Sequence, residues 1–127
     1  MMRSAALYCE GYHDRAFLAG WLARRGWTDP GALPNGKRKP VAHPRRGTVV
    51  TGGRFAFCSP GGACFAEVVP CEGDGSVIAE AVGAVARAPD GMDDVIIVID
   101  ADVDDPEEGR RRRWQALEHA VWAAKGL

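Results

Sequence analysis

An unbroken aliphatic run that ends in acidic residues constrains the fold of this chain most. Residues 95–99 are Val-Ile-Ile-Val-Ile, and Asp100, Asp102 and Asp104 follow at alternate positions. A β-branched run of this kind is typical of a strand buried on both faces of a parallel sheet, and the change to polar residues marks its end. Because side chains two apart in an extended segment point to the same side, Asp100 and Asp102 can face one cation. Oxygen ligands favour Mg²⁺, Mn²⁺ or Ca²⁺ over zinc.

The same acidic stretch also contains the start of a helix. Asp105 suits the N-cap position and Glu108 would complete a capping box, so we assign Asp105 to capping. A solvated strand end is the alternative for Asp100 and Asp102, although adjacent like charges repel unless a cation or solvent screens them. An EF-hand is excluded, because Asp105 occupies the glycine position and Arg111 replaces the closing glutamate.

A second strand-turn-helix pattern occurs near the N-terminus. Residues 4–9 form a mostly apolar run that ends at Glu10 and Gly11, and residues 13–25 show helical periodicity. In open α/β sheets, ligands bind at the carboxyl ends of strands, particularly where the strand order reverses. If this strand lies beside residues 95–99, Glu10 and the aspartates meet at one edge. The expected buried stripe of the helix is Phe17, Leu18, Trp21 and Leu22.

The two motifs together resemble the Toprim domain of bacterial primases, topoisomerases of types IA and II, OLD-type nucleases and the small maturase ribonucleases of 5S ribosomal RNA. The resemblance rests on Leu-Tyr-Cys-Glu-Gly-Tyr-His-Asp at residues 7–14 and on Val-Ile-Ile-Val-Ile-Asp-Ala-Asp-Val-Asp at residues 95–104. It implies a Rossmann-like α/β sheet, mostly parallel, with a hairpin insertion and about three flanking helices.

The resemblance also implies roles for individual residues. Asp100 and Asp102 would hold Mg²⁺ or Mn²⁺, and Glu10 would act in acid-base chemistry or assist as a metal ligand. Asp104 corresponds to a third, often acidic position whose role varies. Asp14 matches the acidic position after Glu-Gly, but at a helix start it equally suits a structural cap.

The remaining segments predict a hairpin and two further helices. Residues 48–51, 54–58 and 63–69 are short strand-like runs separated by glycine-rich turns. Ser76 is the expected N-cap of a helix that buries Val77, Ile78, Ala81, Val82 and Val85. A last helix is expected from about residue 106 to residue 124, with Trp114, Leu117, Val121 and Ala124 as its buried stripe. The strand that usually follows in the family is missing after Leu127, so we expect a truncated sheet or a partner that covers its edge.

The charged residues are strongly segregated along the chain. Between residues 30 and 66 there is no acidic residue, whereas residues 90–108 contain nine acidic residues and no lysine or arginine. A basic segment and an acidic site in one domain suit a phosphodiester substrate, because the basic residues can hold phosphates. We predict a nucleic-acid-binding loop at about residues 30–47, with a solvated surface loop as the alternative. Its expected phosphate ligands are Lys37, Arg38, Lys39, Arg45 and Arg46, and His43 is expected at the surface.

Composition fits one compact domain over residues 1–127. The chain is 46% hydrophobic with a net charge of −1, which argues against disorder. No apolar run approaches the roughly 18 residues of a membrane span, and we expect a cytoplasmic protein without membrane contact. The four cysteines form no Cys-x-x-Cys motif, so we expect buried or incidental thiols and not a zinc site.

The resemblance to Toprim proteins implies a nuclease that hydrolyses phosphodiester bonds of RNA or DNA with bound Mg²⁺ or Mn²⁺, and the charge pattern fits this activity. The alternative is a non-catalytic module that binds nucleic acid or protein and needs a partner, which includes a second copy of the chain. A haloacid-dehalogenase-like phosphatase with Asp100 as nucleophile fits poorly, because its Asp-x-Asp motif usually follows the first strand.

Overall fold

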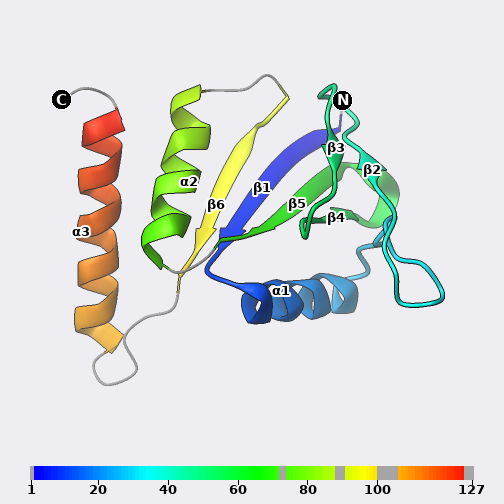
Figure 1. The fold of residues 1–127 in the computed structure, drawn as a ribbon, viewed down its shortest axis with the longest axis horizontal. Helices are drawn as coiled ribbons and strands as arrows, with labels where there is room; N and C mark the ends of the chain where they lie inside the picture. Colours follow the sequence, from blue (N-terminus) through cyan, green and yellow to red (C-terminus); the bar gives the residue numbers. More distant parts are fainter. Residues whose placement is uncertain (1, 72–73, 88–90, 100–105, 125–127) are drawn as a thin grey trace.

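The chain folds into a mixed four-stranded sheet with three helices, two of which pack against the sheet while the last packs against the second helix (Figure 1). The computed structural model describes residues 2–71, 74–87, 91–99 and 106–124. In spatial order, the strands are β4 (Phe55–Cys58), β5 (Cys64–Pro70), β1 (Arg3–Cys9) and β6 (Asp94–Val98). β1, β5 and β6 are parallel, and β4 runs antiparallel to β5 in a hairpin. The predicted α/β class, with a mostly parallel sheet and three helices, is confirmed.

β1 is the central strand, and the order of the strands reverses beside it. It pairs with β5 on one side and with β6 on the other, so that Cys9 lies opposite both Pro70 and Val98. α1 (Tyr12–Arg24) follows β1, and α2 (Asp74–Arg87) lies between β5 and β6 in the chain. In open α/β sheets, the carboxyl ends of the strands next to such a reversal form the usual ligand site.

The first two helices cover opposite faces of β1. Leu7 and Cys9 pack with Leu22 of α1, whereas Tyr8 packs with Val77 of α2. This division follows from the alternation of side chains along a strand. All residues of β1 except the first are buried, which explains why this strand is almost wholly apolar.

β6 is an edge strand, and the prediction that it is buried on both faces is wrong. Within the described part of the chain it pairs with β1 alone. Val95 and Ile97 pack against the core on the α2 side, but Ile96 on the opposite face is 45% exposed. The reason is that α1 packs over β5 and β4, so that on this face of β6 Val98 packs against the core but Ile96 stays exposed.

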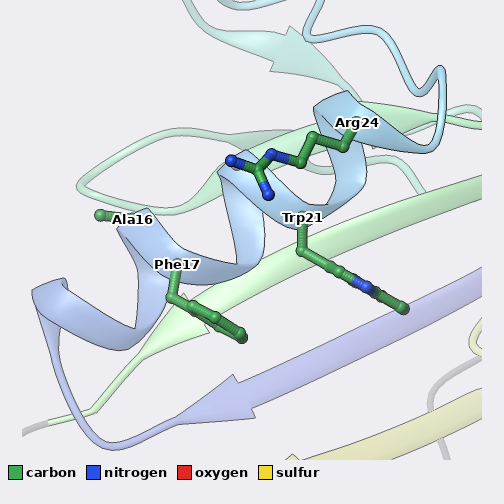
Figure 2. A pocket seen from close by; sticks show the side chains of 5 residues that line it. Ala16, Phe17, Trp21 and Arg24 are labelled. Carbon is green, nitrogen blue, oxygen red and sulfur yellow. The ribbon is translucent and has the colours of Figure 1, made fainter.

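The predicted buried stripe of α1 is wrong for two of its four residues. Leu18 and Leu22 are buried, but Phe17 is 71% exposed and Trp21 is 46% exposed. Both rings project from the same side of the helix (Figure 2), whereas Leu18 and Leu22 pack against the sheet. They line a shallow hollow of about 280 Å³ together with Ala16, Gly20 and Arg24.

α2 lies where it was predicted, with two differences. The helix begins at Asp74, so Ser76 lies inside its first turn and is not the N-cap. Val85 is exposed, because the helix buries a narrower face than the apolar pattern indicates. The predicted core residues Val77, Ile78, Ala81 and Val82 are all buried.

α3 (Pro106–Ala124) confirms the predicted last helix and packs against α2. Leu117 is partly buried against the core on that side, as expected. The predicted burial of Trp114 is wrong: the side chain is exposed, and its indole N–H donates to Glu118 Oε1 at 3.0 Å on the same helix. The structure does not describe the side chains of Val121 and Ala124, so their burial stays a prediction. No helix in the described ranges is both long enough and apolar enough to cross a membrane.

A short β-ribbon covers the hairpin on the face that carries α2. β2 (Val41–Ala42) pairs antiparallel with β3 (Val49–Val50), and Val50 packs with Ala56 and Phe65. The run at residues 48–51 therefore belongs to this ribbon, whereas the predicted hairpin consists of β4 and β5.

Replacing Leu22 by alanine should destabilise the protein by about 2–5 kcal/mol, because it leaves a cavity between α1 and the sheet. Phe17→Ala on the same helix should change the free energy of unfolding by less than about 0.5 kcal/mol, since its ring is largely in solvent. Urea denaturation of both variants measures the difference. Equal losses would mean that Phe17 is covered in solution.

Candidate functional site

Glu10 lies at the carboxyl edge of the sheet, directly after the central strand. Cys9 is the last residue of β1 and pairs with Val98, the last residue of β6. The expected adjacency of these two strands is confirmed, so the segment after β6 starts at the edge where Glu10 lies. Glu10 is partly buried there.

The predicted aspartates cannot be placed in the same way. Asp100, Asp102 and Asp104 lie outside the described residues, so the metal site that they would form with Glu10 stays a prediction. In the part of the chain that the structure does describe, no group of three or more His, Cys, Asp and Glu side chains is arranged to hold a metal ion.

Asp14 caps α1 and fixes the turn that follows Glu10. The backbone N–H of Gly11 donates to Asp14 Oδ2 at 3.1 Å, and Gly11 has an extended backbone before the first helical residue. Of the two roles considered for Asp14, the structure shows capping. The cap matters for the site, because it sets the direction in which the chain leaves Glu10.

Beside this turn lies a cluster of two arginines and two aromatic rings, which we call the arginine–aromatic cluster: Tyr12, Arg15, Arg38 and Phe55. The Arg15 guanidinium carbon lies 4.6 Å from the centroid of the Tyr12 ring and 4.0 Å from that of Phe55. The Arg38 guanidinium carbon lies 3.6 Å from the Phe55 centroid. These are cation–π contacts, so the rings and the positive charges hold one another in place.

The two arginines of the cluster differ in how their charge is balanced. Arg38 donates two hydrogen bonds to the carboxylate of Asp29, at 2.7 and 2.9 Å. Arg15 donates to the Gly53 carbonyl at 2.6 Å and forms no ion pair with any carboxylate of the described residues. Sequence analysis missed Arg15 and Tyr12, because they lie on a helix outside the basic loop. The sequence feature that could have identified them is their position in the first helical turn after Glu10 and Gly11.

The predicted basic loop does not form one continuous surface. Lys37 and Lys39 are exposed and flank Arg38, which belongs to the arginine–aromatic cluster. Arg45 instead donates to the Met2 carbonyl and forms an ion pair with Asp93, at the amino edge of β1 and β6. The first half of the loop therefore lies at the arginine–aromatic cluster. Its second half lies at the amino edge of the sheet, opposite the edge that carries Glu10.

The second half of the loop also contradicts the predicted charge separation. Asp93 and Asp94 belong to the acidic stretch, yet they pair with Arg45 and Arg3 at the amino edge. Asp93 Oδ2 also accepts a hydrogen bond from the Ser4 backbone N–H, which together with the Arg45 charge lowers the pKa of Asp93. Arg46 packs against Gly91, where a Cβ atom would lie 2.9 Å from the Arg46 Cγ. These contacts are structural.

His43 is buried, contrary to the expectation of a surface residue. Its Nδ1 accepts the backbone N–H groups of Arg45 and Arg46, both at 3.1 Å, so the ring proton is on Nε2. Nε2 therefore donates to Ser4 Oγ at 3.0 Å. Burial lowers the pKa of His43, and the nearby charge of Arg46 lowers it further. The histidine attaches the basic loop to the sheet.

A polar pocket of about 390 Å³ lies on the α2 side of the sheet, lined by Tyr8, Arg54, Ala79, Glu80 and Arg87. Arg54 donates to the buried carboxylate of Glu67 at 3.1 Å. The Cys71 thiol donates to Glu80 Oε2 at 3.1 Å, and burial with this hydrogen bond raises the pKa of Cys71 to about 12. Of the two arginines that line the pocket, Arg54 is paired with Glu67, and Glu80 adds a carboxylate to the pocket wall, so the formal charges of these four residues cancel.

Comparisons with protein-family models, with curated proteins and with solved structures give no match for this chain.

The attachment by His43 predicts an acid-sensitive fold. Because the pKa of His43 is lowered in the folded state, the unfolded state takes up the proton first as the pH falls below about 6.5, and stability decreases there. Urea denaturation between pH 7.5 and pH 5 should show this loss. His43→Asn, which keeps a neutral acceptor, should have a smaller pH dependence over the same window, and an unchanged one would contradict the assignment.

Proposed function

We propose that this protein hydrolyses phosphodiester bonds of nucleic acid with the help of Mg²⁺ or Mn²⁺, at the carboxyl edge of β1 and β6. One observation carries the proposal: β1 and β6 are adjacent and parallel, with Cys9 opposite Val98. The two motifs that resemble the Toprim pattern therefore start from neighbouring strand ends at one edge. Ligands bind at such an edge in open α/β sheets.

The donor groups of the two motifs fit a hard divalent cation. Glu10 lies partly buried at the edge, and Asp100, Asp102 and Asp104 would add further carboxylate oxygens from the segment after β6. Bound Mg²⁺ or Mn²⁺ would supply an activated water and offset the negative charge that builds up on the phosphate. Glu10 would take the proton from the attacking water or complete the ligand set.

Positive charge near this edge supports a polyanionic substrate. Arg15 is in the first turn of α1, five residues after Glu10, and is not paired with a carboxylate among the described residues. Lys37 and Lys39 add two exposed charges beside Arg38. Arg45 and Arg46 were also predicted to bind phosphate, but their contacts at the amino edge make them the weaker candidates.

Exposed apolar side chains support the alternative, a non-catalytic module that needs a partner. Phe17 and Trp21 project from α1, and Ile96 is exposed on the edge strand β6. A sheet edge with uncovered apolar side chains is a common place for another chain to bind. The two functions differ in one measurable respect, which is cleavage by the isolated chain.

The proposed metal site predicts stabilisation by Mg²⁺ or Mn²⁺. At about 100 times the dissociation constant, the metal should add roughly 2.7 kcal/mol to the free energy of unfolding. Asp102→Asn should reduce this gain. Asp94→Asn is the matched control, because Asp94 lies at the opposite end of β6 and pairs with Arg3. Thermal melts with and without metal distinguish them, and equal stabilisation of all three proteins would argue against the site.

The proposed role of Glu10 predicts a loss of catalysis without a loss of fold. Glu10→Gln should reduce cleavage of labelled RNA or DNA by about 10²-fold or more, the usual scale for removing acid-base catalysis. The far-ultraviolet circular dichroism and the melting temperature should stay close to those of the wild type. If wild-type protein binds these substrates but cleaves none with either metal, the partner-dependent module becomes the better account.

A further inference from the structure

Tyr12 presents a largely exposed aromatic ring next to the proposed site. It is the first residue of α1, two positions after Glu10, and it is 63% exposed. One side of the ring contacts the Arg15 guanidinium at 4.6 Å, so the ring is supported from within the molecule. A side chain held by such a contact loses less freedom when a ligand stacks on it.

Arg15 is fixed in this position by three contacts. Its guanidinium lies against the rings of Tyr12 and Phe55, and its Nη1 donates to the Gly53 carbonyl at 2.6 Å. Its Nε is buried and has no hydrogen-bond partner. A buried N–H group without a hydrogen bond lowers the stability of the fold. Arg15 also has no carboxylate partner among the described residues. It therefore supports the Tyr12 ring and adds a positive charge beside it that no described carboxylate balances.

Gly53 brings the turn before β4 close to this arginine. The glycine has a φ of +91°, and a Cβ atom there would lie 3.7 Å from Arg15 Nη1 and 3.8 Å from the Tyr12 ring. The left-handed conformation favours glycine and points its carbonyl at the guanidinium. The turn, the helix start and Phe55 thus form one support under the Tyr12 ring.

We propose that the exposed face of Tyr12 is a stacking platform for a base of single-stranded nucleic acid. Arg15, with Lys37 and Lys39 around Arg38, supplies the positive field for the neighbouring phosphates. An aromatic ring beside a positively charged groove is the usual arrangement for single strands, because an unpaired base exposes its whole face. Duplex bases are already stacked on each other. This inference rests on the proposed function and specifies its substrate as an unpaired strand that enters beside Glu10.

The test is binding of fluorescein-labelled oligo-dT and oligo-U to the full chain in EDTA, followed by fluorescence anisotropy. Without metal the strand is bound but not cleaved. Tyr12→Ala should weaken binding roughly 5- to 100-fold, the range for removing one base–aromatic stack. Tyr12→Trp should retain it. Phe17→Ala is the matched control, because Phe17 is also largely exposed on the same helix but lies outside the arginine–aromatic cluster.

The outcomes separate this inference from the function on which it rests. If wild-type protein binds the single strands and Tyr12→Ala binds them equally well, the platform is refuted and the proposed function stands. A duplex of the same sequence that binds as tightly as the single strand refutes the platform as well. If wild-type protein binds no nucleic acid either in EDTA or with Mg²⁺, the proposed function fails, and the platform fails with it. Melting temperatures of the variants show whether each is folded.

Discussion

The burial of β1 on both faces, with a parallel strand at each edge, is the constraint on which the rest of the structure depends. Its alternate side chains form part of two separate cores, one under α1 and one under α2. Each large apolar side chain buried in this way contributes about 1.5–3 kcal/mol. The backbone groups of the strand are satisfied by β5 and β6. Because β1 is packed on both faces and paired at both edges, the position at which the following residues leave the sheet is fixed.

The charges of the arginine side chains are balanced differently at the two edges of the sheet. At the amino edge, Arg3 pairs with Asp94, and Arg45 pairs with Asp93, so opposite charges compensate each other. At the carboxyl edge, Arg15 is held by aromatic rings and a backbone carbonyl, with no carboxylate partner among the described residues. The first arrangement attaches the loop to the sheet, whereas the second leaves positive charge for a ligand.

Sequence patterns predicted the elements better than their surroundings. The apolar runs located β1 and β6, and helical periodicity located all three helices, because local hydrophobic patterns reflect secondary structure directly. The patterns did not show that α1 packs toward β4, which exposes Phe17 and leaves Ile96 uncovered. The environment of His43 depends on contacts with Ser4, which is distant in sequence. The candidate site was predicted at Glu10, but Tyr12 and Arg15 became visible only through contacts with Phe55 and Gly53.

The central place of β1 also has a consequence for how the chain folds. Its partners come much later in the sequence, since Arg3 pairs with Cys64 and Ala5 pairs with Asp94. Both hydrogen-bonding edges of this apolar strand therefore stay open until most of the chain is available. Long-range parallel pairing of this kind makes folding slow and exposes the strand to association with other chains. The residues of β1, which hold the folded sheet together, are thus the ones that most need protection from association with other chains during folding.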